Sequence, residues 1–122
     1  MRSRPERRGA PRVASRLPLT LTRQAEELVT RTKNISASGA YCQIPRFVAP
    51  MTTLQVRLEI PSRSHPAHIE CQGVVVRVEP ARLNPSPSRY HVAIFFSDLA
   101  DRDRAVIARY VQQRLRITSP RA

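Results

Sequence analysis

The stretch Leu54-Gln55-Val56-Arg57-Leu58-Glu59-Ile60 alternates strictly between apolar and polar side chains. Successive side chains of an extended strand point to opposite faces, so this pattern makes one face apolar and the other wet. The stretch therefore predicts a half-buried β-strand whose leucine, valine and isoleucine side chains lie in a core. Antiparallel sheets commonly have this arrangement, because only one of their faces is covered.

Five further strand-like runs lie on either side of this strand. They cover residues 16–22, 27–33, 40–44, 68–79 and 90–96. In the first of them Leu17, Leu19 and Leu21 alternate with polar residues and proline, whereas the residues of 27–33 do not decide which side faces inward. Proline-containing segments at 61–66 and 80–89 are typical of turns and loops.

The run at 68–79 contains a change of phase. Its apolar positions shift from Ile69 and Cys71 to Val74, Val76 and Val78. An extra residue in one strand of a pair produces such a shift, and glycine accepts the unusual backbone of some bulges. We therefore expect a β-bulge at Gly73 in the middle of this strand.

The end of the chain has a helical pattern. Its apolar stripe consists of Val106, Ile107, Tyr110, Val111 and Leu115. These residues recur at the spacing of one helix face, which must be buried against the sheet or a partner. Six antiparallel strands with one polar face suggest closure, because closure removes exposed edges. The sequence thus predicts a mainly β protein, a six-stranded antiparallel β-barrel with a C-terminal α-helix.

The length and composition agree with a single domain. A chain of 122 residues can bury a core without staples. We expect a flexible arginine-rich N-terminal arm at residues 1–12, the barrel and helix at 13–117, and a tail at 118–122.

The chain is strongly basic, with 21 lysines and arginines against 9 acidic residues and a net charge of +12. Only Lys33 is a lysine. A genome rich in G and C would produce this arginine bias without selection for function. The charge still favours anionic partners such as a nucleotide, a nucleic acid or an acidic protein.

The sequence contains no evident targeting or membrane segment. Its longest aliphatic run, 74–76, is far shorter than the roughly 20 residues of a membrane helix. We expect a soluble, cytoplasmic protein without membrane insertion. Cys42 and Cys71 lie inside strand-like runs and are interpreted as buried thiols, with a disulfide or a metal role as the alternative.

Two polar motifs stand out. The first is Arg7-Arg8-Gly9-Ala10-Pro11-Arg12, which ends just before the strands begin, and the second is Asn34-Ile35-Ser36-Ala37-Ser38-Gly39. Arginine forks suit phosphates and guanine edges. Pro11 disfavours helical backbone at Ala10, so we expect Arg8 and Arg12 on an irregular loop. In an extended 34–36 stretch, the asparagine and serine would share one face.

These two motifs together resemble the signature of PilZ domains, bacterial receptors for cyclic di-GMP, in which RxxxR is followed by D/N-x-S-x-x-G. The resemblance covers about residues 6–115, and it includes Gly73-Val74-Val75-Val76-Arg77 and the run at 90–96. It implies the six-stranded barrel and the C-terminal helix. Ala93 departs from the family, because many members carry glycine there.

The resemblance implies a ligand site made of seven residues. They are Arg7, Arg8, Arg12, Asn34, Ser36, Gly39 and Arg77. Arg8 and Arg12 would read guanine edges and phosphates, and Arg7 would contact a second ligand molecule, so two cyclic di-GMP can bind per chain. Ser36 would reach a phosphate. Gly39 would either adopt a positive φ or let the ligand approach the backbone.

Arg77 would stack on a guanine. The equally good alternative is that Arg77 is an ordinary solvated arginine at the end of a strand. No cofactor other than the cyclic di-GMP ligand, no metal and no catalytic residue is expected. His65, His68 and His91 lack metal-ligand spacing with the cysteines, and the carboxylates are explained by helix capping.

Two other functions compete with this interpretation. One is a basic nucleic-acid-binding β-barrel, which the charge allows but the low aromatic content, 5%, disfavours. The other is a PilZ-like adaptor that binds proteins and no nucleotide. As a small stand-alone receptor domain, the chain would signal through an effector protein that the sequence does not name; motility, polysaccharide synthesis and virulence are all compatible outputs.

Overall fold

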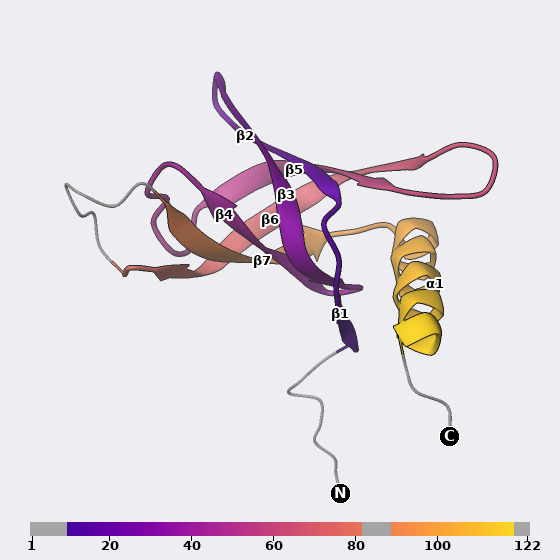
Figure 1. The fold of residues 1–122 in the computed structure, drawn as a ribbon. Coiled ribbons are helices and arrows are strands. Elements are labelled where there is room, and N and C mark those ends of the chain that lie inside the picture. The colour runs from indigo at the N-terminus through magenta and orange to yellow at the C-terminus, as the bar shows by residue number, and fades with distance from the viewer. Residues whose placement is uncertain (1–9, 82–88, 119–122) are drawn as a thin grey trace, which may run out of the picture.

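The chain folds as an antiparallel β-barrel with one helix beside it (Figure 1). The computed structural model describes residues 10–81 and 89–118. Its elements are β1 (Arg12–Ala14), β2 (Pro18–Arg23), β3 (Glu26–Ser36), β4 (Gly39–Ile44), β5 (Thr53–Ile60), β6 (Ala67–Glu79), β7 (Tyr90–Asp98) and α1 (Asp101–Thr118).

Six of the strands close on themselves in the order β3-β2-β5-β6-β7-β4, and β4 then pairs with β3. Every neighbouring pair is antiparallel. The predicted six-stranded barrel with a C-terminal helix is thus confirmed. The short strand β1, which the pattern did not predict, pairs with the end of β3 beyond β2.

The core lies inside the barrel and follows the alternation of β5. The side chains of Leu54, Val56, Leu58 and Ile60 are at most 3% exposed. Burying each of them stabilises the fold by about 1.5–3 kcal/mol. The prediction for this strand is confirmed, because its polar residues face outward.

The phase change in β6 lies later than predicted. Burial continues without interruption through Ile69, Cys71, Gly73 and Val75, although a register shift does occur between Gln72 and Gly73. The change follows Val75, which pairs with Ile94, while Arg77 pairs with the adjacent Ala93. Val76 is therefore the extra residue. The sequence pattern predicted that Val76 is buried, but its side chain is 53% exposed.

The sequence left the inward side of 27–33 undecided; in β3 the less exposed residues are Leu28, Thr30 and Thr32, and a second irregularity follows Thr32. Thr32 pairs with Cys42, whereas Asn34 pairs with the adjacent Tyr41, so Lys33 is an extra residue in β3. Thr32 and Ile35 are buried. Lys33 and Asn34, although consecutive, both remain on the outer side of the barrel.

A break separates β1 from β2, and the hydroxyl of Thr32 fills it. This hydroxyl accepts a hydrogen bond from the Leu17 amide at 2.8 Å and donates one to the Ser15 carbonyl. Both strands thereby run along the same edge of β3. Arg12, which we expected on an irregular loop, instead begins β1 opposite Ser36.

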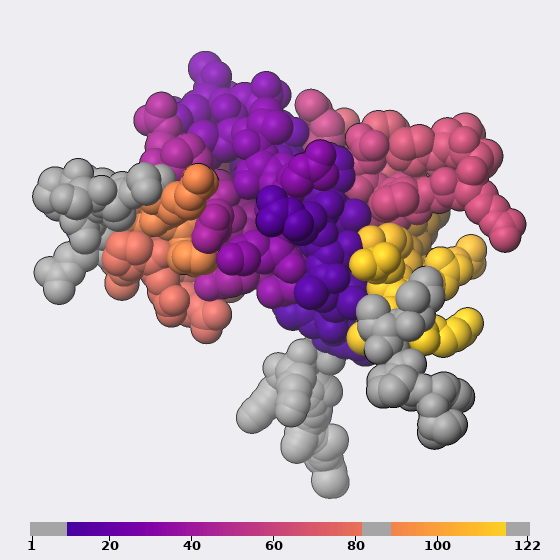
Figure 2. Space-filling view, in the orientation of Figure 1, coloured from indigo at the N-terminus to yellow at the C-terminus, as the bar shows by residue number. Residues whose placement is uncertain are grey.

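Helix α1 covers the barrel beside β1 (Figures 1 and 2). Ile107 and Val111 are at most 2% exposed, and the rest of the predicted stripe packs against the same core. The Tyr110 hydroxyl lies 2.5 Å from that of Ser15, just after β1. The predicted apolar stripe is confirmed as the face that the barrel buries.

Cys42 and Cys71 are both free and buried, in agreement with structural thiols. Burial raises the pKa of Cys42 to about 12. Burial, together with the carboxylates of Asp98 and Asp103, raises the pKa of Cys71 to about 11. The neutral thiol is therefore the native form of both residues.

We predict that neither cysteine reacts with a thiol reagent such as DTNB in the folded protein at about pH 8, because only the thiolate attacks. Adding urea should release both thiols for reaction. Since the unfolded thiols ionise near pH 9, they also lower the free energy of unfolding as the pH rises through about 9–11. Rapid labelling of the native protein by DTNB would contradict the burial.

Candidate functional site

A groove of about 440 Å³ lies on the outer face of the barrel, across β3, β4, β7 and β6. We call it the strand groove. Its lining residues are Arg12, Asn34, Ser38, Gly39, Ala40, Tyr41, Val76, Arg77, Ala93, Ile94 and Phe95. Four of the seven residues in the predicted site, Arg12, Asn34, Gly39 and Arg77, thus come together in one groove.

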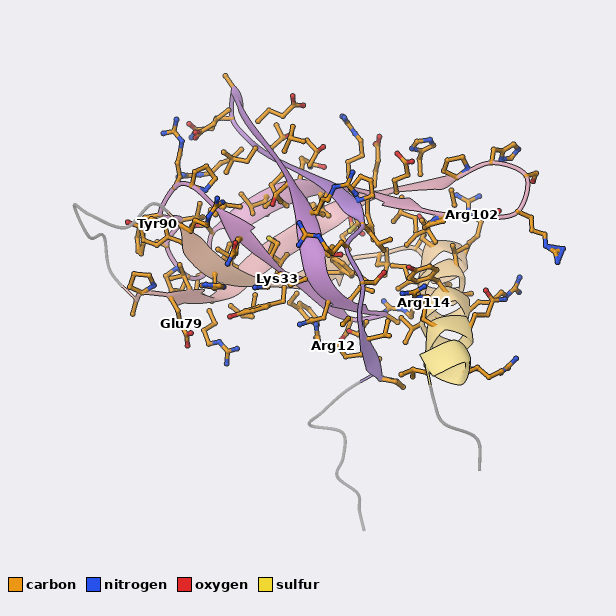
Figure 3. The ribbon with its side chains drawn as sticks, viewed as in Figure 1. Arg12, Lys33, Glu79, Tyr90, Arg102 and Arg114 are labelled. Atoms are coloured by element: carbon orange, nitrogen blue, oxygen red, sulfur yellow. The ribbon has the colours of Figure 1, made fainter. Side chains whose placement is uncertain are left out.

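One side of the groove is an arginine–asparagine pair. The Arg12 guanidinium donates a hydrogen bond to Asn34 Oδ1 at 2.6 Å. Pairing of β1 with β3 brings the two residues together, and the extra residue Lys33 keeps Asn34 outward. Partial burial lowers the pKa of Arg12, which nevertheless stays charged at neutral pH. Arg12 is labelled near the foot of β3 in Figure 3.

The opposite side of the groove is formed by the β6 bulge. Because Val76 is an extra residue, Val76 and Arg77 are both exposed. Arg77 reaches only a loose, exposed contact with Glu79, at 4.0 Å, which contributes little. Two guanidinium groups therefore flank the groove across β4 and β7. The strands that carry them, β1 and β6, are four strand spacings apart through β3, β4 and β7, roughly 19 Å along the sheet.

The floor between these arginines is largely apolar. Phe95 is 49% exposed, although it lies in a strand whose neighbouring residues Ile94 and Phe96 are buried. Tyr41 and Ala93, which pair across β4 and β7, complete the floor. Exposed aromatic and aliphatic groups of this kind can stack on a planar base. Sequence reasoning missed Phe95, although alternation in β7 could have placed it outward.

Ser36 does not line the groove. Its side chain is fully buried, and its hydroxyl accepts hydrogen bonds from the amides of Ser38, at 3.1 Å, and Gly39, at 3.2 Å. We expected this hydroxyl to point outward with Asn34. In this structure it instead braces the turn that joins β3 to β4.

The glycine at position 39 is explained by packing between strands, which is neither of the two roles that we expected, a positive φ or the approach of a ligand. Its φ lies outside the left-handed region, so no positive φ is required. A Cβ at this position would lie 2.2 Å from the carbonyl oxygen of Ile94. Gly39 therefore allows β4 to approach β7 closely at one wall of the groove.

Arg7 and Arg8, the other two predicted site residues, lie outside the described residues. Within residues 10–81 and 89–118, no group of three histidine, cysteine, aspartate or glutamate side chains is arranged to hold a metal ion. In the same part of the chain, no helix is both long enough and apolar enough to cross a membrane.

Comparison with known proteins identifies a family and several similar solved structures. A family model described as "PilZ domain" matches residues 6–113. The fold is similar to that of an inhibitor of motility (MotI/DgrA) from Bacillus subtilis, with a TM-score of 0.80 and 23% identity. That match covers 97% of this chain but only 56% of the other, and at this identity it shows the fold alone. No curated protein matches the chain.

We predict that Gly39→Ala destabilises the fold by about 1–3 kcal/mol, because a backbone carbonyl cannot move aside as a side chain can. Urea unfolding followed by circular dichroism measures this change. The matched control is Ser38→Ala in the same turn. This variant loses only the side-chain hydrogen bond between the Ser36 and Ser38 hydroxyls, which lie 3.0 Å apart. Equal stability of the two variants would show that the close approach to Ile94 is unimportant.

Proposed function

The chain belongs to the PilZ domain family, and we propose that it is a cyclic di-GMP receptor that passes the signal to a protein partner. The observation that carries this proposal is the strand groove, in which the Arg12–Asn34 pair faces Arg77 across an apolar floor. This arrangement offers planar cationic donors, an amide and a stacking surface within one concavity. The groove suits a ligand that is both anionic and aromatic.

The chemistry of cyclic di-GMP matches each part of the strand groove. Each guanine presents O6 and N7 acceptors, which an arginine reads with two parallel hydrogen bonds. On one side of the groove Asn34 orients Arg12 through a hydrogen bond, and on the other side Arg77 has only the loose contact with Glu79. Phe95 and Val76 supply exposed apolar surface against which a guanine can lie.

The arginines before β1 complete the proposed site. Arg8 precedes Arg12 by four residues in the sequence, and Arg7 directly precedes Arg8. Because β1 holds Arg12 at the groove, the segment that precedes it in sequence starts from the groove. We propose that this arm orders around the nucleotide, with Arg7 supporting a second, stacked ligand molecule. Ligand anions would offset the repulsion between its guanidinium groups.

The receptor would act without catalysis and in the cytoplasm, through an effector protein. The protein of similar fold is an inhibitor of motility, and control of motility is one output compatible with this proposal. A general nucleic-acid binder is the competing function, because the net charge of +12 also attracts polyanions. The two differ in salt dependence, since polyanion binding falls steeply as salt rises.

We predict that isothermal titration calorimetry detects binding of cyclic di-GMP. Cyclic di-AMP should bind at least about tenfold more weakly, because adenine lacks the O6 acceptor that the arginines are proposed to read. GTP serves as a control for the phosphates alone. Absence of heat and of a thermal shift at hundreds of micromolar cyclic di-GMP would refute the receptor. Equal binding of both cyclic dinucleotides would refute guanine recognition.

We predict that Arg8→Ala and Arg12→Ala each weaken cyclic di-GMP binding by about 1–3 kcal/mol, the scale of one bidentate guanine contact. The free energy of unfolding of Arg12→Ala should change by less than about 1 kcal/mol, because Arg12 is not in the core and its hydrogen bond to Asn34 is exposed. We expect an equally small change for Arg8→Ala. The matched control is Arg57→Ala, an exposed arginine whose partner Glu70 lies 3.5 Å away, outside the strand groove.

Limited trypsin digestion tests the arm in the same proteins. Cleavage after Arg7 and Arg8 should slow when cyclic di-GMP is added to the native chain, and it should not slow for Arg12→Ala at the same concentration. Normal affinity of either arginine variant, or cleavage that is independent of ligand, would show that the arm does not close on the nucleotide.

We predict two cyclic di-GMP molecules per native chain and a shift towards one in Arg7→Leu, which removes the guanidinium fork. The reason is charge, since a stacked pair of ligands brings twice the phosphates of one. Calorimetry gives the stoichiometry directly. A ratio of one for both proteins would assign Arg7 no such role.

A further inference from the structure

A second groove, of about 340 Å³, lies on the outer face of the barrel around β3. We call it the basic groove. It is lined by Arg16, Val29, Thr30, Arg31, Thr32, Lys33, Gln43 and Arg89. None of these residues lines the strand groove, so this is a separate surface. Figure 3 labels Lys33, which lines the basic groove, and Arg12, which lines the strand groove.

The basic groove concentrates positive charge without neutralising it. Four of its lining side chains are cationic and none is acidic. In the described part of the chain, no carboxylate forms an ion pair with Arg16, Arg31, Lys33 or Arg89. The Arg31 guanidinium donates to the Arg16 carbonyl, at 3.4 Å, across the break between β1 and β2. Cations clustered around a concave surface raise the local potential and attract an anion.

The form of the groove indicates which kind of anion fits. Phosphate sites commonly use free backbone amides at a loop or a helix N-terminus. Here residues 29–31 of β3 are paired with β2, Thr32 is paired with Cys42 of β4, and the Thr30 hydroxyl donates to the Gln43 carbonyl. Four cationic side chains line the groove, so we expect side chains to provide most of the recognition. Val29 is 75% exposed among the cations. Val29 thus adds an apolar contact to a groove lined by three arginines, a residue type that is enriched in protein interfaces.

We propose that the basic groove is a docking surface for an acidic segment of a partner protein. Carboxylates of the segment would pair with Arg16 and Arg31, whose planar forks match carboxylate geometry. An apolar side chain next to those carboxylates would cover Val29. Lys33 adds a flexible charge at the side nearest Asn34.

The position of this surface gives it a connection with the ligand. Lys33 lines the basic groove and its neighbour Asn34 lines the strand groove, and both face outward. On β4, Tyr41 lines the strand groove and Gln43 lines the basic groove. His91 of β7 stacks on Tyr41 and lies 3.2 Å from the side-chain nitrogen of Gln43. A partner in the basic groove would therefore lie beside the nucleotide. Only this last connection rests on the proposed function, because the docking surface exists without ligand.

The experiment measures fluorescence anisotropy of a labelled peptide of alternating glutamate and leucine, mixed with the full chain without nucleotide. The groove variant is Arg16→Gln/Arg31→Gln. The matched control is Arg63→Gln/Arg109→Gln, which removes the same charge from two arginines elsewhere on the surface. The groove variant should bind the peptide about tenfold more weakly, and the control less than about twofold.

Two further measurements test the parts of the proposal. Val29→Ser should weaken peptide binding about threefold without a charge change. Replacing glutamate by glutamine in the peptide should abolish binding. Melting temperatures check that each variant folds, and cyclic di-GMP binding, titrated separately, should be the same for the groove variant and native protein. The docking and receptor proposals can therefore fail independently.

Three results would overturn the docking surface. The first is the absence of peptide binding to the native chain at hundreds of micromolar. The second is an equal loss of peptide affinity in the groove variant and its charge-matched control, which would show that binding depends on net charge alone. The third is tighter binding of a single-stranded oligonucleotide of the same charge through Arg16 and Arg31, which would assign the groove to nucleic acid.

Discussion

The structure depends on one strand, β3, that pairs with three others. It closes the barrel through β4 while β2 and β1 share its other edge. The two edge strands do not join smoothly, and the Thr32 hydroxyl bonds to the backbone on both sides of the gap. A buried hydroxyl is stable only with such partners. Without this arrangement β1 would have no place on the sheet, and Arg12 would not reach Asn34.

Several side chains of the candidate site lie where the strands depart from regular alternation. A regular strand offers every second side chain to its outer face. The extra residue in β3 adds Lys33 beside Asn34, and the extra residue in β6 adds Val76 beside Arg77. Each bulge thus doubles the number of outward side chains at one point. Both points border the strand groove, where Asn34 bonds to Arg12 on one side and Arg77 lies on the other.

Local patterns were sufficient for the regular parts of the fold and insufficient for these irregular ones. Alternation in β5 and the stripe of α1 correctly predicted which residues are buried. The phase change in β6 was assigned to Gly73, where a register shift does occur, but the extra residue of β6 is Val76. That glycine is instead required by the side chains of Ile94 and Val56, which a Cβ would approach to 2.6 and 2.8 Å. Such neighbours come from distant strands and leave no trace in a local window.

The motif residues show the same limit in the candidate site, since Ser36 and Gly39 have geometric roles that the signature alone does not reveal. The bond between the hydroxyls of Ser15 and Tyr110 adds a consequence for the order of folding. It joins residues 95 positions apart. A strand of three residues has few ladder bonds of its own, so β1 relies on such contacts. Because closing so long a loop is slow, the arginine side of the groove is expected to be assembled only after the helix has docked.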